Sequence, residues 1–178
     1  MINKTAIISK KSRIGKNVSI GPYCIIEDNV VIGDNTSIGP YSLIKKFTEI
    51  GKDCRIFSHC VLGEIPQDKK FNDEITKLII GDNNTIREFC TINRGTEESG
   101  ETIIGNNCLF MAYVHVAHDC ILRNDIILAN GVQLGGHVEI NDFAIIGGMT
   151  PVHQFCKIGK YAFVGGGLRV VQDVPPFI

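Results

Sequence analysis

The chain has no tryptophan, no excess of charge of either sign and no long apolar run. Its formal net charge of −1 gives no reason to expect a nucleic acid as a partner. No apolar stretch approaches the ~18 residues that a membrane-spanning helix needs, and the N-terminus lacks the apolar core of a secretion signal. We therefore expect a cytoplasmic protein with no transmembrane segment and no nucleic-acid partner.

A six-residue repeat runs through the sequence. From Ile8 to Val170 every sixth position is Ile, Leu, Val or Phe, and only Asp68, Glu74 and Glu98 interrupt the series. A period of six fits neither the 3.6-residue period of an α-helix nor the two-residue alternation of a simple strand. It is typical of a β-solenoid, in which each hexad forms one short strand and a turn.

The length of 178 residues fits a single domain over residues 1–178. Three hexads make one triangular coil of 18 residues, so we expect an all-β parallel β-helix of about nine coils, stacked ~4.8 Å apart. Residues 65–77 and 94–102 are polar and lack the repeat, but neither segment shifts its phase. Both are expected to be loops that project from the scaffold, where functional residues often lie.

Small residues occupy two other positions of the repeat. Twelve of the 19 glycines directly follow the aliphatic position, which predicts a turn with positive φ there. All seven cysteines fall at multiples of six, two places before the aliphatic position. This register predicts small packing residues rather than disulfides or metal ligands, and reduced thiols in this number favour the cytoplasm.

Polar residues converge on one face in the second half of the chain. Between residues 104 and 170 there is no insertion, so residues 18 apart should stack. Gly136 and Gln154 then lie one and two coils beyond His118, with His137 and His153 beside them. Histidine can act as a general base near neutral pH, with Asp119 fixing its tautomer, and the N–H of Gly136 can stabilise an oxyanion. The alternative interpretation is a polar surface of a solenoid without chemistry.

Longer motifs give the sequence a specific resemblance. They are GEIPQDKKF (63–71), TINRGT (91–96), HVAHDC (115–120), GGHV (135–138), IIGGMTPVHQFCKIG (145–159) and QDVPP (172–176). Over almost its whole length the chain resembles the UDP-N-acetylglucosamine O-acyltransferases that begin lipid A synthesis. These are left-handed β-helix trimers that use acyl-carrier protein.

The resemblance implies a role for individual residues. His118 would take the proton from the 3-hydroxyl (or 3-amino) group of the sugar, Asp119 would support it, and the Gly136 N–H would hold the oxyanion. The acyl chain would lie near Phe163 and Gly166. The implied substrate-binding residues are Gln67, Asp68, Lys70, His115, His137, His153 and Gln154.

The resemblance also implies the partners. The acyl donor would be acyl-carrier protein, the acceptor a UDP-sugar and the assembly a homotrimer with sites between subunits, with no metal and no bound cofactor. The sequence departs from the family in two places: Asn93 stands where TIHRGT is usual, and the chain ends at Ile178, before the usual helical C-terminal region.

Three other functions remain open at this point. A coenzyme A-dependent N-acyltransferase of a nucleotide-linked amino sugar would use a coenzyme A thioester in place of acyl-carrier protein. A zinc hydratase would need three protein ligands, but His115 and His118 should point in different directions along a strand. A scaffold that has lost its activity would keep the repeat alone.

Overall fold

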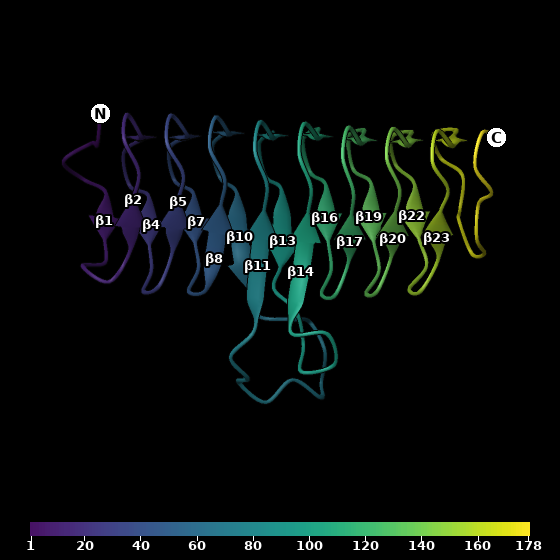
Figure 1. Cartoon of the computed structure of the whole chain (residues 1–178), viewed down its shortest axis with the longest axis horizontal. Helices are drawn as coiled ribbons and strands as arrows, with labels where there is room; N and C mark the ends of the chain where they lie inside the picture. The colour runs from purple at the N-terminus through teal and green to yellow at the C-terminus, as the bar shows by residue number, and fades with distance from the viewer.

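The chain forms a left-handed parallel β-helix, as the repeat and the resemblance predict. A computed structural model describes all 178 residues. The coils lie side by side along one long axis, with the N-terminus at one end and the C-terminus at the other (Figure 1). No part of the chain is a helix of the length and apolarity needed to cross a membrane.

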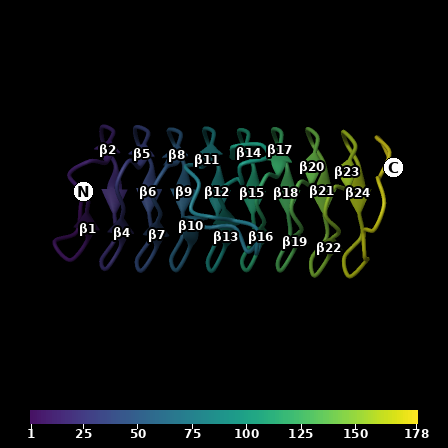
Figure 2. The ribbon, with the colours of Figure 1, turned by 90° about the horizontal axis from the view of Figure 1, so that it is seen from below.

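Three parallel sheets of eight strands form the three faces of the prism (Figure 2). The first sheet contains β1 (Ile7–Ile8), β4 (Ile25–Ile26), β7 (Leu43–Ile44), β10 (Val61–Glu64), β13 (Thr91–Asn93), β16 (His115–Val116), β19 (Gln133–Leu134) and β22 (Pro151–Val152). The second contains β2 (Arg13–Ile14), β5 (Val31–Ile32), β8 (Thr48–Ile50), β11 (Lys77–Ile80), β14 (Glu101–Ile104), β17 (Ile121–Leu122), β20 (Glu139–Ile140) and β23 (Lys157–Ile158). The third contains β3 (Ser19–Ile20), β6 (Ser37–Ile38), β9 (Arg55–Ile56), β12 (Thr85–Ile86), β15 (Leu109–Phe110), β18 (Ile127–Leu128), β21 (Ile145–Ile146) and β24 (Phe163–Val164).

The register between coils is the one that the repeat predicts. Outside the two insertions each strand pairs with the strand 18 residues further on, as Val116 does with Leu134. Single bridges, such as Ile2 with Ile20 and Val152 with Val170, extend the ladder past the eight paired coils at both ends. The expected nine coils are therefore eight complete ones flanked by partial turns.

The interior is a stack of aliphatic side chains. Every aliphatic position of the repeat from Ile20 to Val170 is buried, and only Ile8 and Ile14 at the N-terminal end are partly exposed. All seven cysteines are buried and free, as their position in the repeat predicts. The core therefore depends on similar apolar contacts repeated from coil to coil.

The glycines of the repeat do not have the positive φ that we expected. Among the twelve, only Gly63 does, at 83°. The other positive-φ positions mostly fall two residues later, where Asn, Asp or an aromatic residue stands, as at Asn35 (60°) and Tyr41 (59°). The glycine is needed instead because the next coil approaches closely: a Cβ on Gly105 would lie 2.4 Å from the carbonyl oxygen of Arg123.

Side chains at the turns bind successive coils together. On one edge Asp142 Oδ1 accepts a hydrogen bond from the backbone N–H of Asn124, 2.9 Å away in the preceding coil. On another edge an aromatic column stacks with ring centroids about 5 Å apart. It consists of Tyr23, Tyr41, His59, Phe89 and Tyr113.

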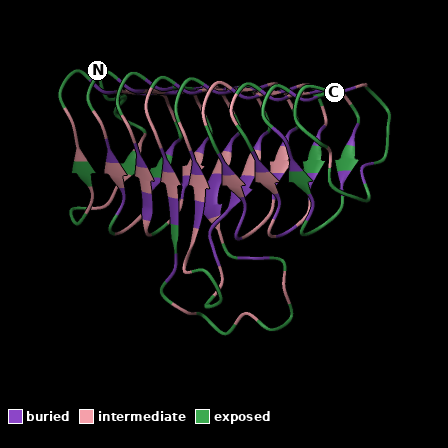
Figure 3. Cartoon of the chain, turned by 45° about the vertical axis from the view of Figure 1, so that its right-hand side comes forward, coloured by how far each residue is buried: buried purple, intermediate pink, exposed green.

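Two loops leave the middle of the prism at the remaining edge, between the first and second sheets (Figure 1). The first joins β10 to β11 and covers residues 65–76, and the second joins β13 to β14 and covers residues 94–100. Both re-enter slightly earlier than the sequence suggested, because β11 and β14 begin at Lys77 and Glu101 and pair over four residues. Figure 3 shows the loops largely exposed beside the buried inner surface of the prism.

Candidate functional site

The two loops and the turns beside them enclose a cleft of about 670 Å³. Most of its lining is polar and charged, in contrast to the apolar interior. The lining residues are Gln67, Asp68, Lys69, Lys70, Phe71, Glu74, Thr96, Glu97, Glu98, His118, His137, Gln154 and Phe155. Of the substrate-binding residues that the sequence suggested, five line this cleft: Gln67, Asp68, Lys70, His137 and Gln154.

His118 and Asp119 form a hydrogen-bonded pair at the base of the cleft, in the turn between β16 and β17. His118 Nδ1 lies 2.7 Å from Asp119 Oδ2, and the histidine side chain is 15% exposed whereas the aspartate side chain is fully buried. Asp119 adopts a positive φ of 60°, which turns its side chain towards the histidine that precedes it. The bond to Nδ1 fixes the ring and leaves Nε2 available for chemistry.

The second loop surrounds the Asp119 carboxylate with further donors. The backbone N–H and the hydroxyl of Thr96 each lie 2.8 Å from it, and the Ser99 hydroxyl also donates to it. Burial alone would raise the pKa of Asp119, but the hydrogen bonds from His118, Ser99 and Thr96 outweigh burial and hold that pKa well below its usual range. The carboxylate is therefore ionised at any physiological pH.

The charge of this carboxylate acts on His118. The hydrogen bond to Asp119 raises the pKa of His118, burial opposes the rise, and the nearby charges of Asp119, Asp68 and Glu98 reinforce it. The raised pKa makes this histidine a stronger base than a free imidazole.

Gly136 lies directly against the His118 ring. A Cβ on Gly136 would lie 2.6 Å from His118 Cε1 and 2.9 Å from Nε2, so only glycine fits beside the imidazole. No carbonyl or side chain of the chain accepts a hydrogen bond from the Gly136 N–H, although the glycine is buried. An unpaired buried N–H next to a base is a donor left free for an oxygen atom from outside the protein.

His137 completes the polar base of the cleft. Its ring meets that of His118 edge-on at 5.3 Å and stacks on Phe155 at 4.6 Å. Its Nε2 lies 3.5 Å from Asp119 Oδ2 and 3.7 Å from Glu98 Oε2. Phe155 thus fixes the plane of His137 while both carboxylates face its ring nitrogen.

The first loop carries charged groups over the cleft and is anchored at its start. Asp68 Oδ1 accepts a hydrogen bond from the Lys70 N–H at 2.9 Å. This contact closes a tight turn over residues 68–70. The Asn93 side chain, at the position where the family usually has histidine, donates to the carbonyl of Ile65 at 2.8 Å. Asn93 therefore supports the first loop rather than lining the cleft.

Among the residues expected to bind the substrate or the acyl chain, four do not line the cleft of the single chain. His115 points out from β16, where its Nδ1 lies 2.7 Å from Thr91 Oγ1, and burial lowers its pKa. His153 is exposed and contacts the Gln154 carbonyl. Phe163, on β24, and Gly166, which packs against the backbone of Gly148, lie towards the C-terminal end.

Several residues that line the cleft or contact Asp119 were absent from the sequence prediction. Glu74 and Glu98 were visible as breaks in the aliphatic repeat, and this signal could have identified them. Thr96 and Ser99 could not have been found from the repeat, because their contact with Asp119 depends on the path of the second loop.

A metal ion could be considered at this site, because ligand atoms of His118, Asp119 and His137 lie within 4.8 Å of one another. However, both carboxylate oxygens of Asp119 already accept hydrogen bonds from His118, Thr96 and Ser99. His118 Nδ1 is also occupied, because it is hydrogen-bonded to Asp119 Oδ2. These contacts fit a hydrogen-bonded histidine–carboxylate pair better than a metal centre. His115 does not belong to this group of residues.

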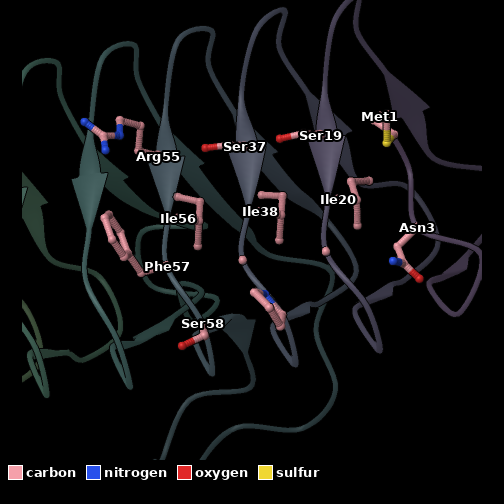
Figure 4. A pocket seen from close by; sticks show the side chains of 13 residues that line it. Met1, Asn3, Ser19, Ile20, Ser37, Ile38, Arg55, Ile56, Phe57 and Ser58 are labelled. Carbon is pink, nitrogen blue, oxygen red and sulfur yellow. The ribbon is translucent and has the colours of Figure 1, made fainter.

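A second hollow, of about 620 Å³, lies on the outer face of the third sheet near the N-terminus. Figure 4 shows Ser19, Ser37 and Arg55 along successive strands, with Phe57 beside them. Arg55 is its only charged side chain, and it contains no histidine and no carboxylate, so it lacks the groups for acid–base chemistry that the cleft contains.

Comparison with known proteins agrees with this division between scaffold and site. The bacterial transferase hexapeptide family (six repeats) matches residues 11–46 and 101–136, which lie in the prism on either side of the loops. The matched segments are both built of the six-residue repeats that form the prism.

More specific relatives match the whole chain. The acyl-[acyl-carrier-protein]–UDP-N-acetylglucosamine O-acyltransferase of Aliarcobacter butzleri is 58% identical over 177 residues, which are 99% of this chain and 68% of the relative. The crystal structure of the Francisella novicida UDP-N-acetylglucosamine acyltransferase has a TM-score of 0.99 at 43% identity, and covers 100% of this chain and 65% of that one. The structure of LpxA from Acinetobacter baumannii has a TM-score of 0.98 at 44% identity, and covers 99% of this chain and 69% of that one. The chain belongs to the family of acyl-[acyl-carrier-protein]–UDP-N-acetylglucosamine O-acyltransferases.

Proposed function

We propose that this protein moves an acyl chain from acyl-carrier protein to the 3-hydroxyl of UDP-N-acetylglucosamine, with His118 as the general base. The observation that carries the proposal is the His118–Asp119 pair beside the unpaired N–H of Gly136, at the bottom of a polar cleft. The names of the relatives supply the donor and acceptor.

The reaction follows from three groups. His118 Nε2 takes the proton of the sugar hydroxyl as its oxygen attacks the thioester carbonyl carbon. The negative charge that develops on the carbonyl oxygen is met by the Gly136 N–H. The tetrahedral intermediate then collapses, the carbon–sulfur bond breaks, and the proton held by His118 passes to the leaving thiolate.

The loops and the neighbouring turns hold the acceptor. Gln67, Asp68 and Lys70 project from the first loop over the cleft. The cation of Lys70 suits a diphosphate and the two polar side chains suit sugar hydroxyls. His137 and Gln154 face them from the prism.

The acyl chain is assigned to the C-terminal end. Phe163, Leu168 and Val170 line an apolar hollow of about 470 Å³ there, and Gly166 adds no side chain to the neighbouring surface. A hydrocarbon chain would gain free energy by leaving water for such a surface.

We also propose a homotrimer with sites between subunits, in the cytoplasm. An apolar column of Leu109, Ile127, Ile145 and Phe163 runs along the outer face of the third sheet. Outward apolar side chains in register suit burial against another copy of the chain. His115 and His153, which do not line the cleft of one chain, would then contribute at the subunit boundary.

The experiment is mass spectrometry of the product formed from a mixture of 3-hydroxyacyl carrier proteins and UDP-sugars. The expected product is UDP-N-acetylglucosamine acylated on the 3-oxygen. Transfer only from coenzyme A thioesters to an amino sugar would replace this proposal with the N-acyltransferase alternative.

A further inference from the structure

The second loop makes a contact that the scaffold does not require. It leaves the prism after β13, and its backbone is tied to β11 by the Gly95 N–H, which donates to the Lys77 carbonyl at 3.1 Å. The Gly100 N–H donates to the Thr96 carbonyl at 2.8 Å and closes the loop. This geometry presents Thr96 and Ser99 to a carboxylate that lies about 20 residues further along the chain.

Three donors from this loop reach Asp119. The Thr96 N–H donates to Oδ1 and the Thr96 hydroxyl to Oδ2, both at 2.8 Å. The Ser99 hydroxyl donates to Oδ1. The only other side-chain partner hydrogen-bonded to the carboxylate is His118, at Oδ2. The buried aspartate therefore shares its negative charge between the base and the loop.

These shared hydrogen bonds reduce how strongly the Asp119 carboxylate stabilises the protonated form of His118. Each hydroxyl that donates to a carboxylate stabilises the charged form and reduces the charge left for another partner. If the loop donors were removed, the His118 imidazolium would be the main compensation for a buried carboxylate, and the imidazolium would be favoured over the neutral ring.

We propose that Thr96 and Ser99 are positioning residues that hold Asp119 and so limit the basicity of His118, keeping its ring neutral when substrate arrives. The inference deepens the proposed function, because a general base must be unprotonated to act. Neither residue needs to touch the substrate for this role.

Four other titratable side chains face His118, and all four are present in every variant. Asp68 approaches His118 from the first loop and Glu98 from the second. His137 lies in the next coil, and His115 lies on β16, just before His118. Changes confined to Thr96 and Ser99 alter none of these four side chains, and Thr96→Ser also keeps the hydroxyl that accepts a hydrogen bond from the Glu98 N–H at 3.3 Å.

The test uses the full chain and does not need substrate. Nuclear magnetic resonance of histidine-labelled protein follows the five imidazoles against pH, and a His118→Gln sample assigns the signal of His118. In Thr96→Val, Ser99→Ala and the double variant the titration midpoint of His118 is expected to move to higher pH. Thr96→Ser keeps both donors and should return the midpoint to that of the parent protein.

A matched control is Ser37→Ala, which removes a hydroxyl from the outer face of the third sheet and should move no midpoint. An unchanged His118 midpoint in the folded double variant overturns the inference. If the double variant does not fold, the Ser99→Ala and Thr96→Ser pair makes the same comparison.

Activity provides the second readout. The acid limb of kcat/KM should shift upwards in Thr96→Val, so that the rate at acidic pH falls about threefold or more while the rate on the alkaline plateau changes less. A uniform loss at all pH values would indicate a purely structural role. If the parent protein transfers no acyl group, the proposed function fails, but the titration still tests the contact; if it is active and the midpoint stays fixed, only this inference fails.

Discussion

At the scale of single residues, the proposed chemistry depends on the close approach of the His118 ring to the backbone of Gly136. His118 is hydrogen-bonded to Asp119 on one side. On the other side its ring lies against Gly136, where a side chain would not fit. The imidazole is therefore fixed in orientation before any substrate binds, which reduces the cost of positioning it during the reaction.

Substituting His118→Ala should lower kcat by about 100- to 10,000-fold, because it removes the general base. The thermal midpoint should change little, because the ring lies at the edge of the prism rather than in its core. Steady-state rates and thermal unfolding on the same samples check both expectations. His59→Ala, in the aromatic column on another edge, is the control; an equal loss there would argue against a special role for His118.

The rate should fall in acid. The hydrogen bond to Asp119 raises the pKa of His118 above its ordinary value of about 6.5. The base works only when neutral, so activity is full above that raised pKa and declines as pH falls through it. A pH profile of kcat/KM measures the midpoint of the acid limb. A midpoint below that of free imidazole would contradict the assignment of His118 as the base.

The residue scale also separates what the sequence could and could not predict. A spacing of 18 was enough to bring Gly136 onto His118, because stacking in a solenoid follows from counting residues. The contacts of Thr96 and Ser99 with Asp119 were not predictable, because the loop that carries them has no repeat and its path depends on the fold as a whole.

At the scale of the elements, glycine follows the aliphatic residue of the repeat because the backbone of the next coil lies too close for a side chain. The prediction of positive φ at these glycines was wrong because a repeated glycine has two possible causes, backbone torsion and lack of space. A sequence alone does not distinguish them. The structure shows that the next coil lies within 2.4 Å of where a Cβ on Gly105 would stand.

Gly105→Ala should therefore destabilise the prism by about 1–3 kcal/mol or more, because backbone of the neighbouring coil must move to accept the methyl group. Gly165→Ala is the matched control: it has the same place in the repeat, but only the flexible Leu168 side chain lies within 4 Å. Urea denaturation of both variants measures the difference. Equal midpoints would show that crowding by the next coil does not explain the glycine.

At the scale of the whole molecule, the outer faces are not equivalent. The outward positions of the third sheet are polar at one end, with Ser19 and Ser37, and apolar at the other, with Ile127 and Ile145. This division matches the proposed assembly, in which the apolar part is covered by another copy of the chain.

Ile127→Lys should shift the protein from trimer towards monomer, because it would place a charge in the proposed contact between copies. Activity should fall with it, since the sites are proposed to lie between subunits. Sedimentation equilibrium measures the mass. Ser37→Lys changes the same outward position of the same sheet at its polar end and should leave the mass unaltered; if both variants remain trimeric, the apolar column is not the contact.

The lengths of the two loops have a consequence for how this scaffold can be altered. The first loop, residues 65–76, has the length of two hexads, and Thr48 pairs with Leu78 in register. A direct join from Glu64 to Lys77 would thus restore the ordinary spacing of the winding. The first loop is thus an insertion of two hexads in an otherwise continuous winding, whereas His118, Asp119 and Gly136 belong to the winding itself.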